Sequence, residues 1–544
     1  DRLKLSMGET LLRTLPSVER NNSLDQSLLF TAVDLLNQGI NYVPVDDWKR
    51  RIKFAGLNLR VGLEAMASLA FRGSLIYLEM GIYLLQEQQW SPETSSLRID
   101  LYCAAAEANY CIGEFNKAES HTIEVLRQPH VSAEDKFRAK VVQIDILKAQ
   151  NQFQDAISAA LSLLDQLDVK LPSQPSKFAV VKEVIKTKLL LRKRNTNSLN
   201  RMSLMKDKMK VRVMRLLNSL APTAYMARPS LLAIITCHAV SCTVQHGACR
   251  YSPSAFASFG ILLCLKGDLK GGNEFGDVAL GFLEHPGMRE TIARTLMIVH
   301  SCVYHWVHPI QQSIQPLLEG YRIGLENGDI EGAMLSLHCH FVSCFVTGRP
   351  LEQLEADIRS YFVQMKEYRQ EAILAHLMLI WKMILTLMGH LESETSRKKF
   401  VSRTATGGGG IIEDHSNSIT RCWLAYYFGD YDLASSHADT SRRLERPWAH
   451  VLVYRDTMFQ GLVAIAMARK TKRRCHKRRA SVETNKMRKW CSAGNVNCLS
   501  MLHLLEAERA TLGRAKRGHV RKLFDKAISS ASRHGLQHDK ALAS

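Results

Sequence analysis

Proline is scarce in this 544-residue chain, which contains only 14 prolines and none after Pro447. Proline interrupts helices, whereas leucine, alanine, methionine and lysine, which are frequent in many stretches here, form helices well. Alternating apolar and polar runs separated by tight hairpin turns are nearly absent. With 46% apolar residues the chain can still bury a sizeable core. The sequence therefore predicts an all-α protein.

Catalytic signatures are also lacking. The chain has no G-x-x-x-x-G-K-[ST] phosphate loop, no H-R-D or D-F-G kinase motif, no G-x-S-x-G elbow and no H-E-x-x-H metal motif. The four consecutive glycines at 407–410 are followed by Ile-Ile-Glu-Asp, which offers a phosphate no cation. We therefore expect a non-enzymatic chain that holds no cofactor of its own.

Signals for export are missing as well. The sequence opens on Asp1 rather than methionine and shows no signal peptide, so we interpret it as a piece of a longer protein. Its thirteen cysteines lie mostly within apolar runs, which is typical of reduced thiols in an intracellular protein. The longest apolar stretch, 372–389, is interrupted by His376 and Lys382, which favours a buried helix over a membrane span. The predicted compartment is the cytoplasm, with the nucleus as the alternative.

Positive charge is confined to two short islands. The net charge is +20, yet residues 177–215 hold 13 Lys/Arg against two Asp/Glu, and residues 469–489 hold 11 against one. The rest of the chain is nearly neutral. A protein that wraps nucleic acid usually carries its charge along a whole face. The distribution therefore favours two local basic segments, each with a function of its own, in an otherwise neutral protein.

A recurring pattern of Gly or Asn, a bulky residue two positions on, and a small residue three positions later indicates helix pairs. Gly or Asn can end one helix in the left-handed conformation, and the bulky, mostly aromatic residue starts the next helix and fills the space between the pair. The small residue allows the two helices to approach closely. At about 38 residues a unit, the pattern resembles a loose tetratricopeptide repeat. We predict a superhelical α-solenoid of antiparallel helix pairs. The pattern comprises Gly113, Phe115 and Ala118; Asn151, Phe153 and Ala156; Gly267, Leu269 and Gly272; and Gly429, Tyr431 and Ala434.

Two segments that fit no repeat divide the predicted array. One is basic and rich in Asn and Ser, and the other contains the glycine run. The predicted organisation is N-terminal repeats at 1–175, a basic linker at 176–210, central repeats at 211–392, a flexible insertion at 393–418, and C-terminal repeats at 419–544.

Two clusters of histidine and cysteine are candidate metal ligands. His305 and His308 would share a helix face, as would His340 and Cys344, and His300 lies nearby in sequence. A zinc site would need four such ligands to converge, and no paired C-x-x-C motif is present. Because both clusters lie in apolar segments, we favour buried core residues over a metal site.

The run RKTKRRCHKRR at 469–479 interrupts a helical stripe of apolar residues that resumes with Ala480, Met487 and Trp490. We expect it either to bulge outward or to extend a helix into solvent. A solvated regulatory loop, a nuclear-import patch and a nucleic-acid contact are all open interpretations. Ser481, in RRAS, is a candidate phosphorylation site because basic residues precede it. The basic patch comprises Arg473, Arg474, Lys477, Arg478 and Arg479.

Several stretches resemble the helical-repeat region of large hybrid signalling proteins. That family places a serine/threonine-kinase-like domain and a predicted AAA-type ATPase before the repeats, and a sensor or histidine-kinase domain often follows. The family's catalytic motifs lie in domains outside this chain, and the glycine run and basic run look like additions to its pattern. The resemblance lies in the stretches 35–81, 215–234, 252–284, 305–333, 424–434 (LAYYFGDYDLA) and 503–513 (HLLEAERATLG).

The resemblance implies a scaffold that couples a nucleotide switch to an output domain through protein–protein contacts. ATP would bind the upstream domain, and the partner would be another protein or the flanking ATPase and kinase domains. The alternative is the ligand-sensing region of an ATPase-type transcription regulator whose basic segments contact nucleic acid.

Overall fold

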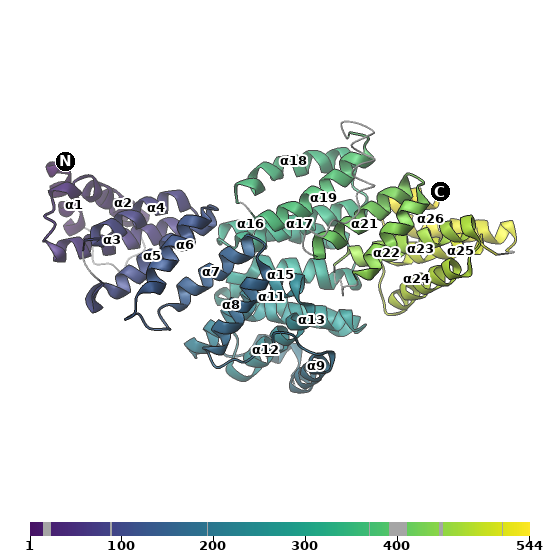
Figure 1. The fold of residues 1–544 in the computed structure, drawn as a ribbon, viewed down its shortest axis with the longest axis horizontal. Coiled ribbons are helices and arrows are strands. Elements are labelled where there is room, and N and C mark those ends of the chain that lie inside the picture. Colours follow the sequence, from purple (N-terminus) through teal and green to yellow (C-terminus); the bar gives the residue numbers. More distant parts are fainter. Residues whose placement is uncertain are drawn as a thin grey trace. The chain divides into compact units, whose positions relative to one another are not determined.

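A computed structural model describes residues 1–14, 23–87, 90–192, 194–368, 370–390, 411–444, 450–513 and 515–544. These residues form 26 α-helices joined by turns and a few short 3-10 or π segments. The β-structure within the described ranges is one isolated bridge between Leu204 and Ala248. The protein is therefore all-helical, as predicted (Figure 1).

The chain divides into two compact units. The N-terminal unit contains Asp1–Gln152, and the C-terminal unit contains most of Phe153–Ser544. Two short segments, Glu326–Gly328 and Glu367–Arg369, are grouped with the N-terminal unit. The division between the two units falls at residue 152.

The N-terminal unit is a row of helices in which each packs against the next. Helix α3 packs closely on α4, α4 on α5, and α5 on both α6 and α7. These helices are α1 (Arg2–Thr14), α2 (Ser23–Gln38), α3 (Trp48–Ala67), α4 (Phe71–Leu85), α5 (Pro92–Cys111), α6 (Phe115–Arg127) and α7 (Phe137–Ala149), with a 3-10 turn η1 at Ile40–Tyr42.

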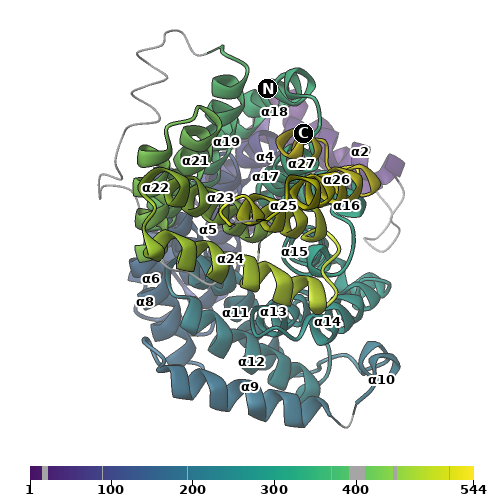
Figure 2. The same cartoon turned by 90° about the vertical axis from the view of Figure 1, so that its right-hand side faces the viewer.

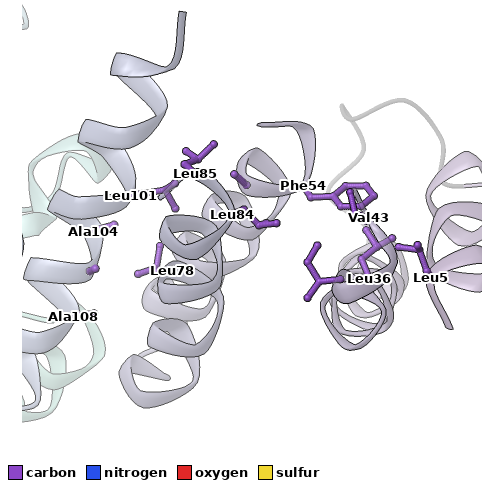
Figure 3. Packing of buried hydrophobic residues seen from close by; sticks show 13 residues of the cluster. Leu5, Leu36, Val43, Phe54, Leu78, Leu84, Leu85, Leu101, Ala104 and Ala108 are labelled. Carbon is purple, nitrogen blue, oxygen red and sulfur yellow. The ribbon is translucent and has the colours of Figure 1, made fainter. Parts of the chain in front are cut away.

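The core of this unit is built from leucine and alanine on facing helices. Leu78 and Leu85 of α4 are buried toward Leu101 and Ala104 of α5, and Leu84 belongs to the same buried cluster (Figure 3). Burial of one leucine side chain contributes about 1.5–3 kcal/mol, so this apolar seam stabilises the row of helices.

The C-terminal unit holds the remaining helices (Figure 2). Its first half comprises α8 (Phe153–Asp165), α9 (Lys177–Leu191), α10 (Thr196–Asn200), α11 (Lys208–Ala227), α12 (Pro229–His246), α13 (Ser252–Leu265), α14 (Leu269–Phe282), η2 (Pro286–Thr291), α15 (Ile292–Ile298), the π segment η3 (Val299–Val303) and η4 (Tyr304–Trp306). Its second half comprises α16 (Gln311–Glu326), α17 (Ile330–Thr347), α18 (Leu351–Glu367), α19 (Glu371–Leu387), α21 (Ile411–Tyr427), α22 (Tyr431–Arg443), α23 (Leu452–Thr471), α24 (Arg474–Ser492), α25 (Leu499–Ala510), α26 (Arg517–Arg533) and α27 (Gln537–Ala543).

Helices of this unit pack in two ways. Sequence neighbours such as α13 and α14, or α23 and α24, pack as pairs. Helices two positions apart also pack, so that α13, α15, α17, α19, α21, α23 and α25 form a continuous series. Helix α21 additionally contacts α11, near the start of that series. Packing between successive repeats fits an α-solenoid.

The predicted repeat turns adopt the expected backbone conformation. Gly113, Gly267, Gly429 and Asn151 have φ values of +78°, +86°, +78° and +64°, and each lies just after the end of a helix. Glycine takes this left-handed conformation without steric penalty. In two of the turns the following aspartate caps the next helix, because its carboxylate accepts a hydrogen bond from the amide of Gly271 or Leu433.

The small residues of the pattern lie where helices approach closely. Ala118, Ala156 and Ala434 are fully buried. At Gly272, a Cβ atom would lie 2.3 Å from the sulfur of Cys264 on the paired helix. The aromatic members of this position are less buried than we expected: Phe115 and Phe153 are half-buried, and Tyr431 is 38% exposed, whereas Leu269 is buried. The aromatic residues therefore cover the edge of a pair more than they fill its interior.

The segments predicted as breaks contain helices. The basic stretch 176–210 includes α9 and α10, and α9 packs against α12. Of the predicted insertion at 393–418, residues 411–418 form the start of α21, and the rest, including the glycine run, lies outside the described residues.

One helix in the described part of the chain, α17, is long and apolar enough to cross a membrane, and 83% of it is buried inside the protein. Such burial is typical of a core helix. The stretch at 372–389 largely coincides with α19, whose residues Leu377 and Ile384 are buried.

Candidate functional site

A cavity with a volume of about 210 Å³ lies inside the C-terminal unit. Side chains from α11, α12, α13, α15, η3, α17, α19 and α21 line it, together with His450 and Leu452 at the start of α23. Most of the lining is apolar, and it includes four methionines, Met214, Met226, Met297 and Met383. Methionine is flexible and polarisable, so such a wall can adapt to the shape of an occupant.

Several polar atoms of the lining are buried without a hydrogen-bond partner. Both ring nitrogens of His450 are in this state, as are Nδ1 of His338 and Nε1 of Trp423. The hydroxyls of Thr236 and Ser416 are also buried without a hydrogen-bond partner. An unsatisfied buried polar atom costs about 1–3 kcal/mol, so six of them around one cavity require an explanation.

Two histidines of the cavity, His338 and His450, are held neutral. Burial lowers the pKa of His338 well below its usual value, and the neighbouring His376 and His450 add to this effect. Burial, together with His305, lowers the pKa of His450 to about 3. At neutral pH His338 and His450 offer hydrogen bonds but no charge. The rings of His338 and His376 meet edge to face with centroids 6.0 Å apart.

Arg294 contributes a positive charge to the lining, and nearby carboxylates balance this charge. Its guanidinium lies 2.7 Å from the carboxylate of Glu331 and 3.8 Å from that of Asp329. It also donates a hydrogen bond to the backbone carbonyl of Asn218. The positive charge is thus balanced by protein groups and is not presented alone to the cavity.

A second feature is an exposed apolar stripe on α9. Phe178 is 79% exposed and Leu189 is 59% exposed, and Val181 and Ile185 lie between them on the same helix face at i+3 and i+7 from Phe178. The opposite face is buried through Val184, Thr187 and Leu191, where α9 packs against α12. Helix α9 lies at the edge of the C-terminal unit (Figures 1 and 2).

Lysines flank the α9 stripe on both sides. At 100° per residue, Lys182 and Lys186 fall along one border of the stripe and Lys177 and Lys188 along the other. All four are exposed, and Lys188 forms a 2.8 Å ion pair with Asp268. An apolar stripe between basic borders is typical of a surface that binds an acidic amphipathic segment or an anionic membrane.

The basic run at 469–479 is the corner between α23 and α24 and not an inserted loop. Helix α23 ends at Thr471, Lys472 is left-handed with φ +59°, and α24 begins at Arg474. Of the two expectations, an outward bulge or a helix that extends into solvent, the second is closer to the structure, because the run continues α23 to Thr471 and begins α24 at Arg474. Deleting 469–479 would therefore remove the last turn of α23 and the first turns of α24.

Neighbouring helices neutralise part of this corner. Arg469 pairs with Glu508 of α25, Lys470 with Asp432 of α22, and Arg479 with Asp439 of α22 at 2.9 Å. The other members of the basic patch remain exposed: Arg473, Arg474, Lys477 and Arg478. The apolar stripe does resume within α24, where Ala480 and Met487 are buried.

Ser481 lies within α24 and not in a loop. Its hydroxyl donates to the carbonyl of Lys477 at 3.1 Å and accepts a hydrogen bond from Arg509 at 3.0 Å. Access by a kinase would require this helical turn to open. A phosphate attached there would lie beside Arg509 and the exposed basic patch.

Four of the candidate metal ligands, His300, His305, His340 and Cys344, are buried core residues, and His308 is half-buried. No group of three or more His, Cys, Asp or Glu side chains is placed to hold a metal ion within the described ranges. Nδ1 of His340 lies 2.9 Å from the carbonyl of Ile314, and its Nε2 lies 3.6 Å from the sulfur of Cys344. His305 packs between Trp306 and Tyr454, and burial lowers the pKa of His300 to about 4.

The sequence interpretation missed both the cavity and the α9 stripe. The stripe was visible, since Phe178, Val181, Ile185 and Leu189 follow helical spacing within a segment dense in lysine. The cavity had no comparable local signal, because helices spread along the chain between α11 and α23 contribute to it.

Comparison with known proteins assigns no family to this chain. No family model matches it, and no curated protein matches it. One similar solved structure is described as "Circular tandem repeat protein with novel repeat topology and enhanced subunit contact surfaces"; it is 11% identical, with 98% of this chain and 99% of that chain covered and a TM-score of 0.13. At that TM-score the likeness carries no argument, so the helical-repeat description rests on the helices of this chain.

Proposed function

We propose that this chain is a non-catalytic helical-repeat scaffold that acts through protein–protein contacts. The observation that carries the proposal is the exposed stripe on α9, where Phe178, Ile185 and Leu189 present apolar surface to solvent. Contiguous apolar patches rimmed by polar residues mark interaction sites in soluble proteins. The tetratricopeptide-like superhelix would supply a rigid support for this surface.

The partner that best fits this surface is an acidic amphipathic helix. Its apolar residues would lie along the α9 stripe at helical spacing, and its carboxylates would reach Lys182 and Lys186 on one border and Lys177 on the other. Such charge complementarity would steer association and fix the register of the two helices.

The sequence resemblance adds a context to this proposal. In a large signalling protein with ATPase, kinase or histidine-kinase domains, the acidic helix would belong to a flanking domain or to a separate protein. The scaffold would then couple a nucleotide switch, with ATP bound outside this chain, to an output domain. This role is an analogy from the resemblance.

The test is a fluorescence-anisotropy titration with a designed acidic peptide. The peptide has about 18 residues, which is long enough to form a helix. It carries leucine at positions i, i+3 and i+7 and glutamate at the positions that flank these leucines. We expect the chain to bind this peptide at least tenfold more tightly than the same peptide with lysine in place of glutamate. The double variant Phe178→Glu and Leu189→Glu should weaken binding at least tenfold, because it places charge in the apolar stripe.

The matched control is Val363→Glu, since Val363 is a 65% exposed apolar residue on α18, away from α9. It should leave binding unchanged. Equal binding of the acidic and basic peptides would contradict the proposal. So would binding of the chain to phosphatidylserine vesicles without binding of the acidic peptide, because the stripe would then be a membrane surface.

A second candidate is nucleic-acid contact through the α23–α24 corner. The exposed side chains of Arg473, Arg474, Lys477 and Arg478 favour it. Binding to phosphates weakens steeply with salt, so a gel-shift titration across salt concentrations tests this candidate. Salt-sensitive binding that Lys477→Ala with Arg478→Ala reduces would support a transcription regulator over a pure scaffold.

A further inference from the structure

We propose that the cavity of the C-terminal unit binds an uncharged, mostly apolar small molecule that carries a hydroxyl or carbonyl oxygen. The geometry that points to this is an apolar cavity whose lining residues His450, His338 and Trp423 carry buried polar atoms without a hydrogen-bond partner. This inference goes beyond the proposed scaffold function and does not depend on α9.

The size of the cavity fits a compact organic molecule. An engineered apolar cavity of about 150 Å³ holds benzene, and the present cavity has a volume of about 210 Å³. The methionines of the lining could adjust to molecules larger than one ring. Ligand sites of this kind are apolar hollows in which a few polar groups fix the orientation of the ligand.

The orphaned atoms define the polar part of the ligand. The indole Nε1 of Trp423 can only donate a hydrogen bond, so it needs an acceptor oxygen. A neutral His450 ring presents one donor and one acceptor nitrogen, and both are buried and without a partner. A hydroxyl both donates and accepts, so a ligand hydroxyl could satisfy either nitrogen of His450.

The charge of the site selects against ions. Burial keeps the pKa of both His338 and His450 low, so neither histidine supplies a positive charge at neutral pH. Arg294 is already balanced by Glu331. An anion or a cation would lose its hydration here without gaining an opposite charge, and burial of an uncompensated charge is strongly unfavourable.

The cavity also lies where an occupant could influence packing. It is lined by α11 and α21, which contact each other although they are distant in sequence, and by α13, α15, α17 and α19 between them. A molecule bound here would contact several helices of the series at once. It should therefore raise the melting temperature of the C-terminal unit, because it binds the folded state alone.

Equilibrium dialysis with three matched probes tests this inference on the full chain: naphthalene, naphthol and naphthoate. These probes share one ring system and differ in having no oxygen, a hydroxyl or a carboxylate. We expect naphthol to bind about fivefold more tightly than naphthalene, which corresponds to one hydrogen bond in a buried site. Naphthoate should bind at least tenfold more weakly than naphthol.

Two cavity variants and one control locate the binding. Ala221→Phe should fill the cavity and weaken naphthol and naphthalene at least tenfold, because Ala221 of α11 is part of the lining. His450→Leu should remove most of the difference between naphthol and naphthalene while naphthalene still binds. His246→Leu is the control, since His246 is exposed at the end of α12 and outside the lining.

Circular dichroism and thermal unfolding would establish that each variant is folded. The inference is wrong if no probe binds the wild-type chain, because the cavity would then hold only water. It is also wrong if naphthoate binds as tightly as naphthol, or if Ala221→Phe leaves binding unchanged in a folded protein. Because α9 is untouched in these variants, failure here leaves the peptide-binding test of the scaffold intact.

Discussion

Arg455 of α23 and Asp539 of α27 form an ion pair that is almost completely buried, with 4% and 2% of their side chains exposed. The same arginine donates a hydrogen bond to the carbonyl of Val346 in α17 at 2.8 Å. The carboxylate also accepts a hydrogen bond from the hydroxyl of Ser500 in α25 at 2.9 Å. Four helices of the C-terminal unit are thus joined through two charged side chains.

Replacement of Asp539 by alanine should destabilise the C-terminal unit by about 3–5 kcal/mol, because it leaves the buried guanidinium of Arg455 without its counter-charge. Urea unfolding followed by circular dichroism measures the change. Lys188→Ala serves as the control, since Lys188 and its partner Asp268 are 44% and 43% exposed. That exposed pair should contribute less than about 1 kcal/mol, and equal losses for the two variants would contradict the predicted role of burial.

Gly272→Ala should destabilise the protein by about 1–3 kcal/mol, because the added methyl group has no room between α13 and α14. Its Cβ atom would lie 2.3 Å from the sulfur of Cys264 and 3.0 Å from the carbonyl of Gly260. Gly518→Ala is a matched test on α26, where the added Cβ atom would have no neighbouring atom within 4 Å. The second change should be neutral or should stabilise by up to about 1 kcal/mol. Thermal unfolding of both variants distinguishes them, and similar behaviour would show that α13 and α14 can move apart.

Acid should destabilise the C-terminal unit through its buried histidines. The folded state holds His450 neutral, with a pKa of about 3, whereas an unfolded histidine has a pKa near 6.5. The stabilising contribution is therefore complete above pH 6.5 and is lost as the pH falls toward 3. In His450→Leu the free energy of unfolding should fall less steeply between pH 6 and pH 4, by up to about 1.4 kcal/mol per pH unit. The exposed-site variant His246→Leu should keep the wild-type slope, and an unchanged slope in His450→Leu would show that this ring is already charged in the folded protein.

Local features of the fold were predictable from the sequence. The left-handed Gly113, Gly267 and Gly429 and the buried Ala118 and Ala434 follow from residue chemistry within ten positions of one turn. The same local reasoning correctly placed Ala480 and Met487 on a buried face after the basic run. Helical spacing reports which side of one helix is apolar, and this information is contained in a short window of sequence.

Features that depend on distant helices were not predictable. Composition suggested a linker at 176–210, but α9 packs against α12 there, with Val184 and Leu191 buried. The dense cations at 469–479 suggested an insertion, whereas Asp432, Asp439 and Glu508 from other helices stabilise a helical corner there. The cavity arises in the same way, because helices as distant in sequence as α11 and α21 both line it.

The contact between α21 and α11 has a consequence for how the protein unfolds. In a strictly linear array each repeat contacts only its neighbours, so the end repeats can fray one at a time. Here helix α21 also contacts α11, and the two are separated by nearly 200 residues of chain. Opening either of them removes support from the other, so the stretch from α11 to α21 should melt as one cooperative block.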